Sequence, residues 1–206
     1  MLPDFIGDAY AAMSVCETAL FVVDAAEGPQ PTTVKLWYAA EDLRLARAVF
    51  VNRVDKENAD FDMCLEMLRE RFGTRLGAVT LPWGTGENFN GIIDLVRMKA
   101  RHCDGTKQTE SEIPEELRDS AEAAHETPCA SSWRRPTTTS WRSTSRASPS
   151  LRTRSRACSP RRSPSACSSP CSPGSCIKEQ GVNSLMDDIA TYFPAPTDST
   201  ARCRSS

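Results

Sequence analysis

The sequence predicts an α/β fold in which a parallel sheet is flanked by helices. Residues 19–24 form a short, continuous apolar run, typical of a strand that is buried on both faces, and residues 46–51 are predicted to form a second buried strand. After a short connection, each stretch is followed by a segment whose apolar residues recur at helical spacing, which favours parallel pairing of the strands. A chain of 206 residues is long enough for one ordinary domain with a small subdomain.

The helices of this pattern are predicted from their apolar faces. The first covers residues 5–16 and precedes the first strand. The second begins at Pro31, a residue suited to the first helical position, and the third runs through residues 61–72 and ends at Gly73. The residues that recur at helical spacing are Phe5, Ile6, Ala9, Met13 and Cys16, then Val34, Trp37 and Ala40, and then Phe61, Cys64, Leu65, Leu68 and Phe72.

The pattern changes after Gly73. Residues 77–82 and 89–96 are predicted to be strands of a separate small sheet, and residues 110–126 are predicted to form an acidic helix. A last amphipathic helix begins near residue 182 and stops at Pro194. The sequence therefore predicts a small α+β subdomain beside the parallel sheet.

Composition and charge exclude several classes of protein. The formal net charge of −2 gives the whole chain no basic footprint, so we expect no DNA partner. No apolar run reaches the roughly 18 residues of a membrane span, and residues 1–8 lack the basic and apolar regions of a secretory signal. Nine cysteines, an odd number, favour a reducing, cytoplasmic chain over a disulfide framework.

The second predicted strand ends in the motif Val51-Asn52-Arg53-Val54-Asp55, which resembles the N-K-x-D motif of GTPases. A carboxylate at Asp55 can accept hydrogen bonds from the ring N–H and the exocyclic amine of guanine, which adenine does not offer in that arrangement. Asn52 would bridge neighbouring loops, and Arg53 would replace the usual lysine over the base plane. A polar turn at a strand end is the alternative interpretation. The position of the motif at a strand end favours a guanine site over a simple turn, because ligands bind beyond the carboxyl ends of parallel strands.

A second candidate element is the segment 174–178, which reads Gly-Ser-Cys-Ile-Lys. It resembles the G-S-A-L-K loop whose backbone N–H groups contact the guanine carbonyl oxygen in the same proteins. An ordinary Gly-Ser turn before a helix is the alternative. Neither segment suggests a catalytic residue or a metal ligand. The candidate guanine-binding residues are Asn52, Arg53, Asp55, Ser175, Cys176 and Ile177.

Taken together, these segments make the chain similar to elongation factor G and its close relatives. The longest match, residues 51–61, reads V-N-R-V-D-K-E-N-A-D-F beside the family's V-N-K-M-D-R-x-N-A-D-F. Residues 20–28 resemble the family's V-V-D-A-x-E-G strand and turn. Shorter matches are residues 4–5 at the end of a switch motif, residues 81–86, 89–96 and 113–117 in the inserted subdomain, and residues 181–194 at the end of the GTP-binding domain.

The resemblance implies a P-loop-NTPase-type parallel sheet, ribosome-dependent GTP hydrolysis, and GTP or GDP with Mg²⁺ and the ribosome as partners. A ribosomal protection protein or a release-factor GTPase is the alternative within this class. The sequence contains no G-x-x-x-x-G-K-[ST] loop and no first switch, and Leu2 stands where the family places its catalytic His. We therefore expect a truncated fragment that lacks the Mg²⁺ ligands and cannot hydrolyse GTP.

Residues 129–173 differ in composition from the rest of the chain. They are rich in Arg, Ser and Pro and contain neither Asp nor Glu. Codons that can encode residues 137–144 give D-D-D-L-M-E-K-Y when read one base back, which resembles D-D-E-L-M-E-K-Y of the family. We therefore interpret this stretch as frameshifted and disordered. The alternative function is that of a non-enzymatic RNA-binding protein with a disordered Arg/Ser arm.

The predicted organisation follows from these assignments. We expect the inserted subdomain to be incomplete, because the biased stretch cannot supply its apolar face. The five parts are residues 1–75, a GTP-binding core without P-loop and first switch; 76–128, the inserted subdomain; 129–173, the biased stretch; 174–195, the last loop and helix of the core; and 196–206, a tail that we also interpret as frameshifted.

Overall fold

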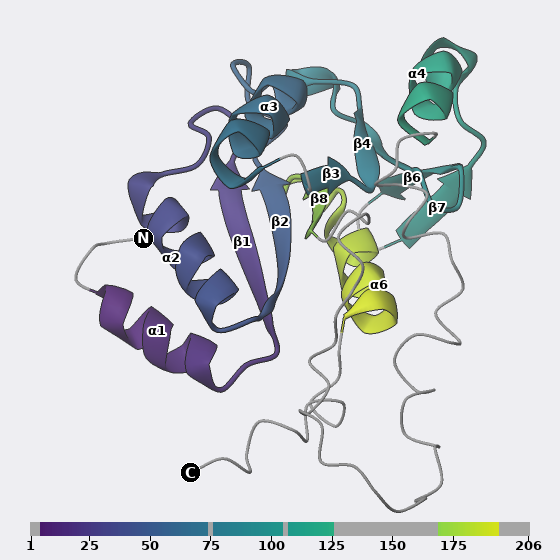
Figure 1. Ribbon diagram of the computed structural model, residues 1–206. Coiled ribbons are helices and arrows are strands. Elements are labelled where there is room, and N and C mark those ends of the chain that lie inside the picture. The colour runs from purple at the N-terminus through teal and green to yellow at the C-terminus, as the bar shows by residue number, and fades with distance from the viewer. Residues whose placement is uncertain (1–4, 74–75, 105–106, 126–168, 194–206) are drawn as a thin grey trace, which may run out of the picture.

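The computed structural model of the chain describes residues 5–73, 76–104, 107–125 and 169–193, which form two four-stranded sheets with helices around them (Figure 1). The first sheet is parallel and has the order β1-β2-β8-β3. Its strands are β1 (Thr18–Asp24), β2 (Ala46–Asn52), β8 (Ser169–Pro173) and β3 (Leu76–Ala78). The predicted α/β fold with a parallel sheet and flanking helices is confirmed.

Sequence signals mark the start of α2 and the end of α3 correctly, whereas α1 is shorter than the predicted residues 5–16. Pro31 occupies the start of α2, and Gly73, with a φ of 92°, follows the end of α3. The side chain of Asp60 caps α3 by accepting hydrogen bonds from the N–H groups of Asp62 and Met63 at 2.9 and 3.1 Å. These helices are α1 (Ile6–Ser14), α2 (Pro31–Asp42), α3 (Phe61–Phe72) and α6 (Val182–Tyr192).

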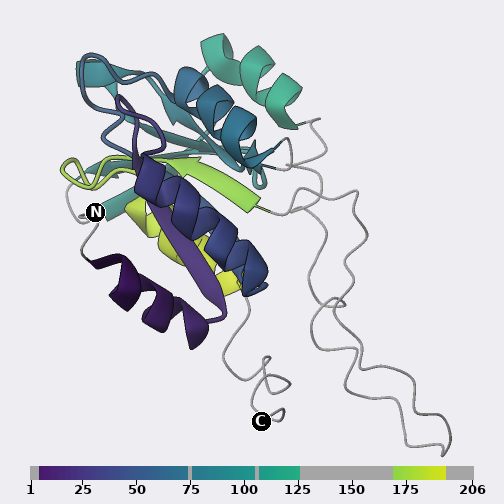
Figure 2. The same ribbon diagram turned by 60° about the vertical axis from the view of Figure 1, so that its left-hand side comes forward.

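The core lies between the parallel sheet and the α2–α3 layer. Phe21, Val49 and Cys171 point from three neighbouring strands into this layer, where they meet Trp37 of α2 and Leu68 of α3. Figure 2 shows α2 in front of the sheet and α6 behind it. Side chains of successive strand residues point to opposite faces, and helices lie on both sides of the sheet.

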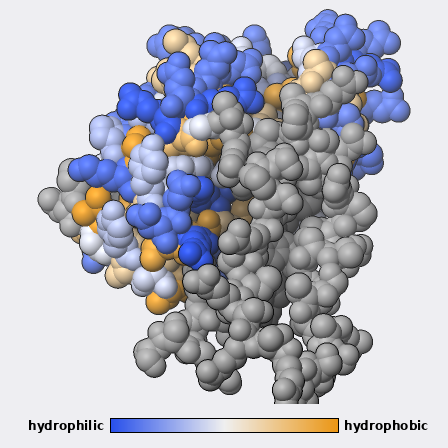
Figure 3. Space-filling model, in the orientation of Figure 1, coloured by the Kyte–Doolittle hydropathy of each residue, from blue (hydrophilic) through white to orange (hydrophobic). Residues whose placement is uncertain are grey.

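Strand β1 departs from its prediction, because it is not buried on both faces. Leu20 and Val22 are 39% and 57% exposed, whereas their neighbours Phe21 and Val23 are buried. The reason is that β1 lies at the edge of the sheet, and α6 covers β2 and β8 but not β1. Figure 3 shows further hydrophobic patches among hydrophilic residues over the α1–α2 end of the molecule.

Strand β8 is a second correction. We expected residues 169–173 to belong to a disordered segment, but they form a central strand between β2 and β3 with all five positions buried. Cys171 pairs with Val49 on one side and with Ala78 on the other. Small Ser, Pro and Cys side chains fit this position between two covered faces, although Pro is rare in central strands. Residues 129–168 lie outside the described part of the chain.

The second sheet is antiparallel and has the order β4-β5-β6-β7. The predicted strand 77–82 is in fact two strands, since residues 76–78 pair within the parallel sheet and the second sheet begins at Thr80. The predicted acidic helix begins only at Glu115, after a strand that ends at Ser111. The elements are β4 (Thr80–Trp83), the 3₁₀ turn η2 (Gly86–Asn88), β5 (Gly91–Asp94), β6 (Lys99–Asp104), β7 (Lys107–Ser111) and α4 (Glu115–His125).

A small core of its own supports this sheet. Ile93 and Leu95 pack with Ala121 of α4, and all three are buried. The division of the chain into the five predicted parts, and the incompleteness of the inserted subdomain, stay predictions.

Within the described residues, no helix combines the length and apolar character needed to cross a bilayer.

Candidate functional site

The candidate site lies at the edge where β2 and β8 end. Because these strands are parallel neighbours, their carboxyl ends place residues 52–55 beside residues 174–181. Two backbone hydrogen bonds connect the segments: Gly174 N–H donates to the Val51 carbonyl at 2.9 Å, and Val54 N–H donates to the Gly174 carbonyl at 3.4 Å. The two stretches that the sequence analysis selected are therefore adjacent.

Asn52 joins the two stretches through its side chain. Its Oδ1 accepts hydrogen bonds from the backbone N–H of Arg53 at 2.9 Å and from that of Cys176 at 3.1 Å. The second bond spans from the end of β2 to the loop after β8. An amide side chain at this position bridges neighbouring loops, as the motif predicts for Asn52.

Ser175 shapes the loop from inside. It is fully buried and exchanges two backbone hydrogen bonds with Gln180, at 2.9 and 3.0 Å, and its Oγ accepts from Lys178 N–H at 3.2 Å. Cys176 and Ile177 form the exposed tip, with Ile177 79% exposed. The loop is therefore a closed turn whose tip faces outward.

Gly174 and Gly181 make this turn sterically feasible. A Cβ on Gly174 would lie 2.5 Å from Cζ of Phe50 and 2.7 Å from the carbonyl oxygen of Gln180. Gly181 has a φ of +82°, in the region that favours glycine. Gly174 is part of a recognisable motif in the sequence, but only the close approach of Phe50 explains why it must be glycine.

Asp55 carries an unpaired buried atom. Its side chain is half-buried, and Oδ1 is buried without a hydrogen-bond partner among the described residues. Buried acceptors are nearly always paired, and an unpaired one costs about 1–3 kcal/mol. Among the described residues, this oxygen is therefore an acceptor without a partner at the carboxyl edge of the sheet.

Arg53 lies at the opposite side of the motif, against the end of β1. Its backbone has a φ of 64°, and its Nη1 donates to Asp24 Oδ2 at 2.8 Å. Lys56 Nζ donates to the same oxygen at 3.2 Å, and Ala26 N–H donates to Asp24 Oδ1 at 3.0 Å. Burial opposes ionisation of Asp24, but these hydrogen bonds prevail and hold its pKa below the ordinary value.

Asp24 lies at the same edge of the sheet, but its pairing with Arg53 was not predicted from the sequence. The available signal was its position at the last residue of β1, in register with Asn52 at the last residue of β2. The structure thus brings together the six candidate residues around two strand ends, with the Arg53 guanidinium paired to a carboxylate.

Similarity to known proteins agrees with this architecture. Residues 3–195 match the family model of the elongation factor Tu GTP binding domain. Over 116 residues the chain is 37% identical to an elongation factor G-like protein of Thermotoga maritima, and the match covers 56% of this chain and 17% of that protein. A crystal structure from Thermus thermophilus shares the fold with a TM-score of 0.71 and 24% identity, over 96% of this chain and 29% of that chain. The chain thus spans less than a third of either protein.

Proposed function

The chain belongs to the family of the elongation factor Tu GTP binding domain, and from this membership we propose that it carries the guanine-recognising edge of an elongation factor G-like translational GTPase. The 37% identity to an elongation factor G-like protein supports the finer assignment. The observation that carries the proposal is the buried, unpaired Oδ1 of Asp55 beside the 174–181 loop.

Guanine fits the donors and acceptors of this edge. Its ring N–H and exocyclic amine are two neighbouring donors, and the unpaired carboxylate of Asp55 accepts them with charge-assisted hydrogen bonds. Adenine has an acceptor at the ring position, so it would leave the carboxylate unpaired. In this proposal Arg53 exchanges its contact with Asp24 for stacking on the base plane, and backbone N–H groups of residues 175–177 bind the guanine carbonyl oxygen.

The phosphates need groups other than these. The 206 residues contain no G-x-x-x-x-G-K-[ST] loop, so the proposal assigns no residue here to the phosphates or to Mg²⁺. GTP or GDP with Mg²⁺, the ribosome and a cytoplasmic location belong to the proposed translational GTPase. This chain by itself is expected not to hydrolyse GTP, and phosphate release above the rate in buffer would contradict that expectation.

The decisive experiment compares nucleosides, which need no phosphate site. Amide chemical shifts near Asn52 and Cys176 are recorded while guanosine, xanthosine or adenosine is added to the chain. Guanosine should shift these signals and adenosine should not. In Asp55→Asn the side-chain amide can donate to the extra carbonyl of xanthine, so the preference should move from guanosine to xanthosine.

Asp60→Asn is the matched control for this experiment. Asp60 lies five residues further along, and its carboxylate caps α3, a role that Asn fulfils equally well. The control variant should keep the preference for guanosine. Equal shifts with guanosine and adenosine, or an unchanged preference in Asp55→Asn, would show that the guanine site is wrongly placed.

A further inference from the structure

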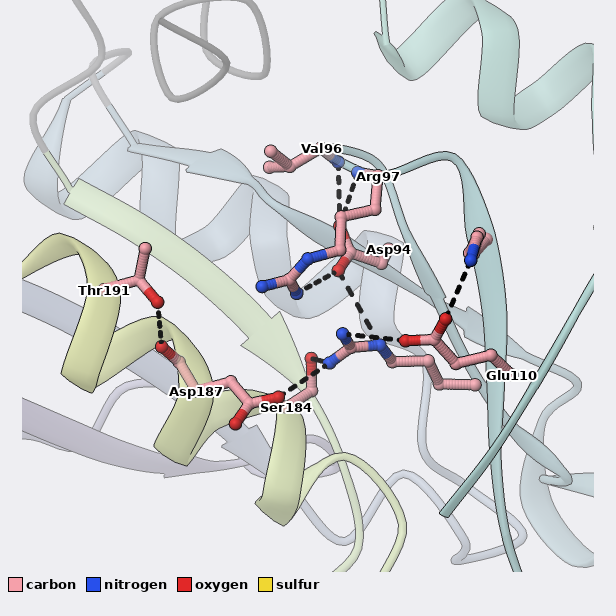
Figure 4. Close-up of polar contacts among 9 residues, drawn as sticks. Asp94, Val96, Arg97, Glu110, Ser184, Asp187 and Thr191 are labelled. Carbon is pink, nitrogen blue, oxygen red and sulfur yellow. Dashed lines mark hydrogen bonds and ion pairs between the residues drawn. The ribbon is translucent and has the colours of Figure 1, made fainter. Parts of the chain in front are cut away.

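Arg101 connects the second sheet to the helix that follows the candidate loop. It lies on β6 and is only 5% exposed, yet its Nη1 donates to Ser184 Oγ and to Asp187 Oδ2 of α6, both at 3.2 Å (Figure 4). These partners are 83 and 86 residues away in sequence. A planar guanidinium can serve several acceptors at once, so one side chain ties two distant elements together.

Carboxylates of the second sheet hold this guanidinium in place. Glu110 Oε1 on β7 accepts from Nη2 at 3.3 Å, and the buried Asp94 on β5 lies 3.9 Å from Nε. Asp94 is itself fixed, because it accepts from the N–H groups of Val96 and Arg97 at 2.9 and 3.0 Å. Arg101 therefore approaches α6 from a rigid base rather than from a flexible surface.

The loop 174–181 also contacts the turn η2 and strand β5 of the second sheet. Lys178 Nζ donates to the carbonyl of Glu87 in η2 at 2.9 Å. A Cβ on Gly181 would lie 3.4 Å from Cγ2 of Ile92 on β5, which shows how closely the loop passes that strand. Because α6 starts at Val182, directly after the loop, a tether on Ser184 restrains the loop as well.

From this arrangement we propose that Arg101 is a positioning residue that holds the loop 174–181 in its binding conformation through α6. The role for guanine recognition rests on the proposed function, whereas the restraint on the loop does not. The second sheet is then a support for the ligand-binding edge: it fixes the far end of the loop, while Asn52 fixes the near end through Cys176.

Hydrogen exchange of the full chain tests the restraint without any ligand. In Arg101→Met the loop amides of Ser175, Cys176 and Gln180 should exchange at least about tenfold faster, since charge-assisted hydrogen bonds to α6 are lost. Amides that pair β1 with β2 should keep their rates. A residue that only stabilised the whole fold would accelerate all of these amides together.

Lys99→Met is the matched control. Lys99 lies on the same strand and pairs with Glu110 at 2.9 Å, but its contact does not extend to α6. Its loss should leave the loop amides unchanged. If Arg101→Met does not fold, Ser184→Ala removes one of the two α6 contacts and should accelerate the same amides by a smaller factor.

The outcomes separate the two proposals. Unchanged loop exchange in Arg101→Met or Ser184→Ala, or uniform acceleration including the β1–β2 amides, would overturn the positioning role. Guanosine titration of the same samples then addresses recognition. If the unmodified chain binds no guanosine, the proposed function fails while the restraint on the loop stands. Weaker guanosine binding in the variants that loosen the loop is the result expected when both proposals hold.

Discussion

Replacing Asp188 by Asn should abolish a pH dependence of folding. Asp188 lies on α6 and is 7% exposed. Burial raises the pKa of its carboxyl to about 7, and repulsion by Asp94 adds to the rise, while Arg97 and Arg101 oppose it. The difference between this folded-state pKa and the ordinary pKa of 3.8 corresponds to a change in unfolding free energy on the order of 4 kcal/mol.

The direction of the effect follows from proton binding. Between pH 4 and pH 7 the folded state keeps the proton on Asp188 and the unfolded state releases it, so the stability that protonation provides is lost as the pH rises. This stabilisation is present in full below the pKa of the unfolded state and absent above the folded-state pKa of about 7. Asn cannot ionise. The unfolding free energy of Asp188→Asn should therefore rise, relative to that of the parent, by on the order of 4 kcal/mol between pH 4 and pH 8.

The assay is urea unfolding at a series of pH values. Trp37 is a suitable fluorescent probe, because it is 2% exposed and stacked on Phe72 at a centroid distance of 4.3 Å. The quantity compared is the difference in unfolding free energy between parent and variant, in which other titrating groups cancel. Asp119→Asn, at an exposed position of α4, should give a difference that does not vary with pH. A constant difference for Asp188→Asn as well would refute the reasoning.

Three further substitutions test other features of the fold. Gly174→Ala should lower the unfolding free energy by about 1–3 kcal/mol, because its Cβ would overlap Phe50 and the Gln180 carbonyl; an unchanged urea midpoint would contradict this. Asp60→Ala should cost about 1 kcal/mol by removing the α3 cap, and a loss equally large in Asp60→Asn would show that the cap is not the cause. The chain should self-associate in sedimentation experiments through the exposed apolar edge strand β1, and Val22→Lys should reduce this association; a parent chain that stays monomeric, or association unaltered in the variant, would contradict this.

Periodicity was sufficient for the parts of the fold in which local and tertiary preferences agree. Strand β2 and helix α3 follow from apolar spacing and, for the end of α3, from Gly73. Strand β8 could not be predicted in this way, since Ser-Pro-Cys-Ser-Pro has low strand propensity and its pairing depends on β2 and β3. The exposure of Val22 likewise depends on which neighbours cover β1, which a single apolar run does not reveal.

The candidate site shows the same division. Asn52, Arg53, Asp55 and residues 175–177 were selected from short motifs, and the parallel pairing of β2 with β8 brings them to one edge. Two contacts were beyond sequence reasoning. The pairing of Arg53 with Asp24 depends on a left-handed backbone conformation at Arg53. The bonds of Arg101 join a strand without a clear periodic signal to partners far along the chain.

The strand order β1-β2-β8-β3 also has a consequence for synthesis on the ribosome. β2 and β3 emerge early but cannot take their places on either side of β8 until residues 169–173 arrive to separate them. Such pairing over a long stretch of chain is slow to form, and during the delay both strands present unpaired backbone edges to other nascent chains. The sheet can therefore close only after residues 169–173 have been synthesised, so its yield in cells should respond to chaperones that shield nascent strands.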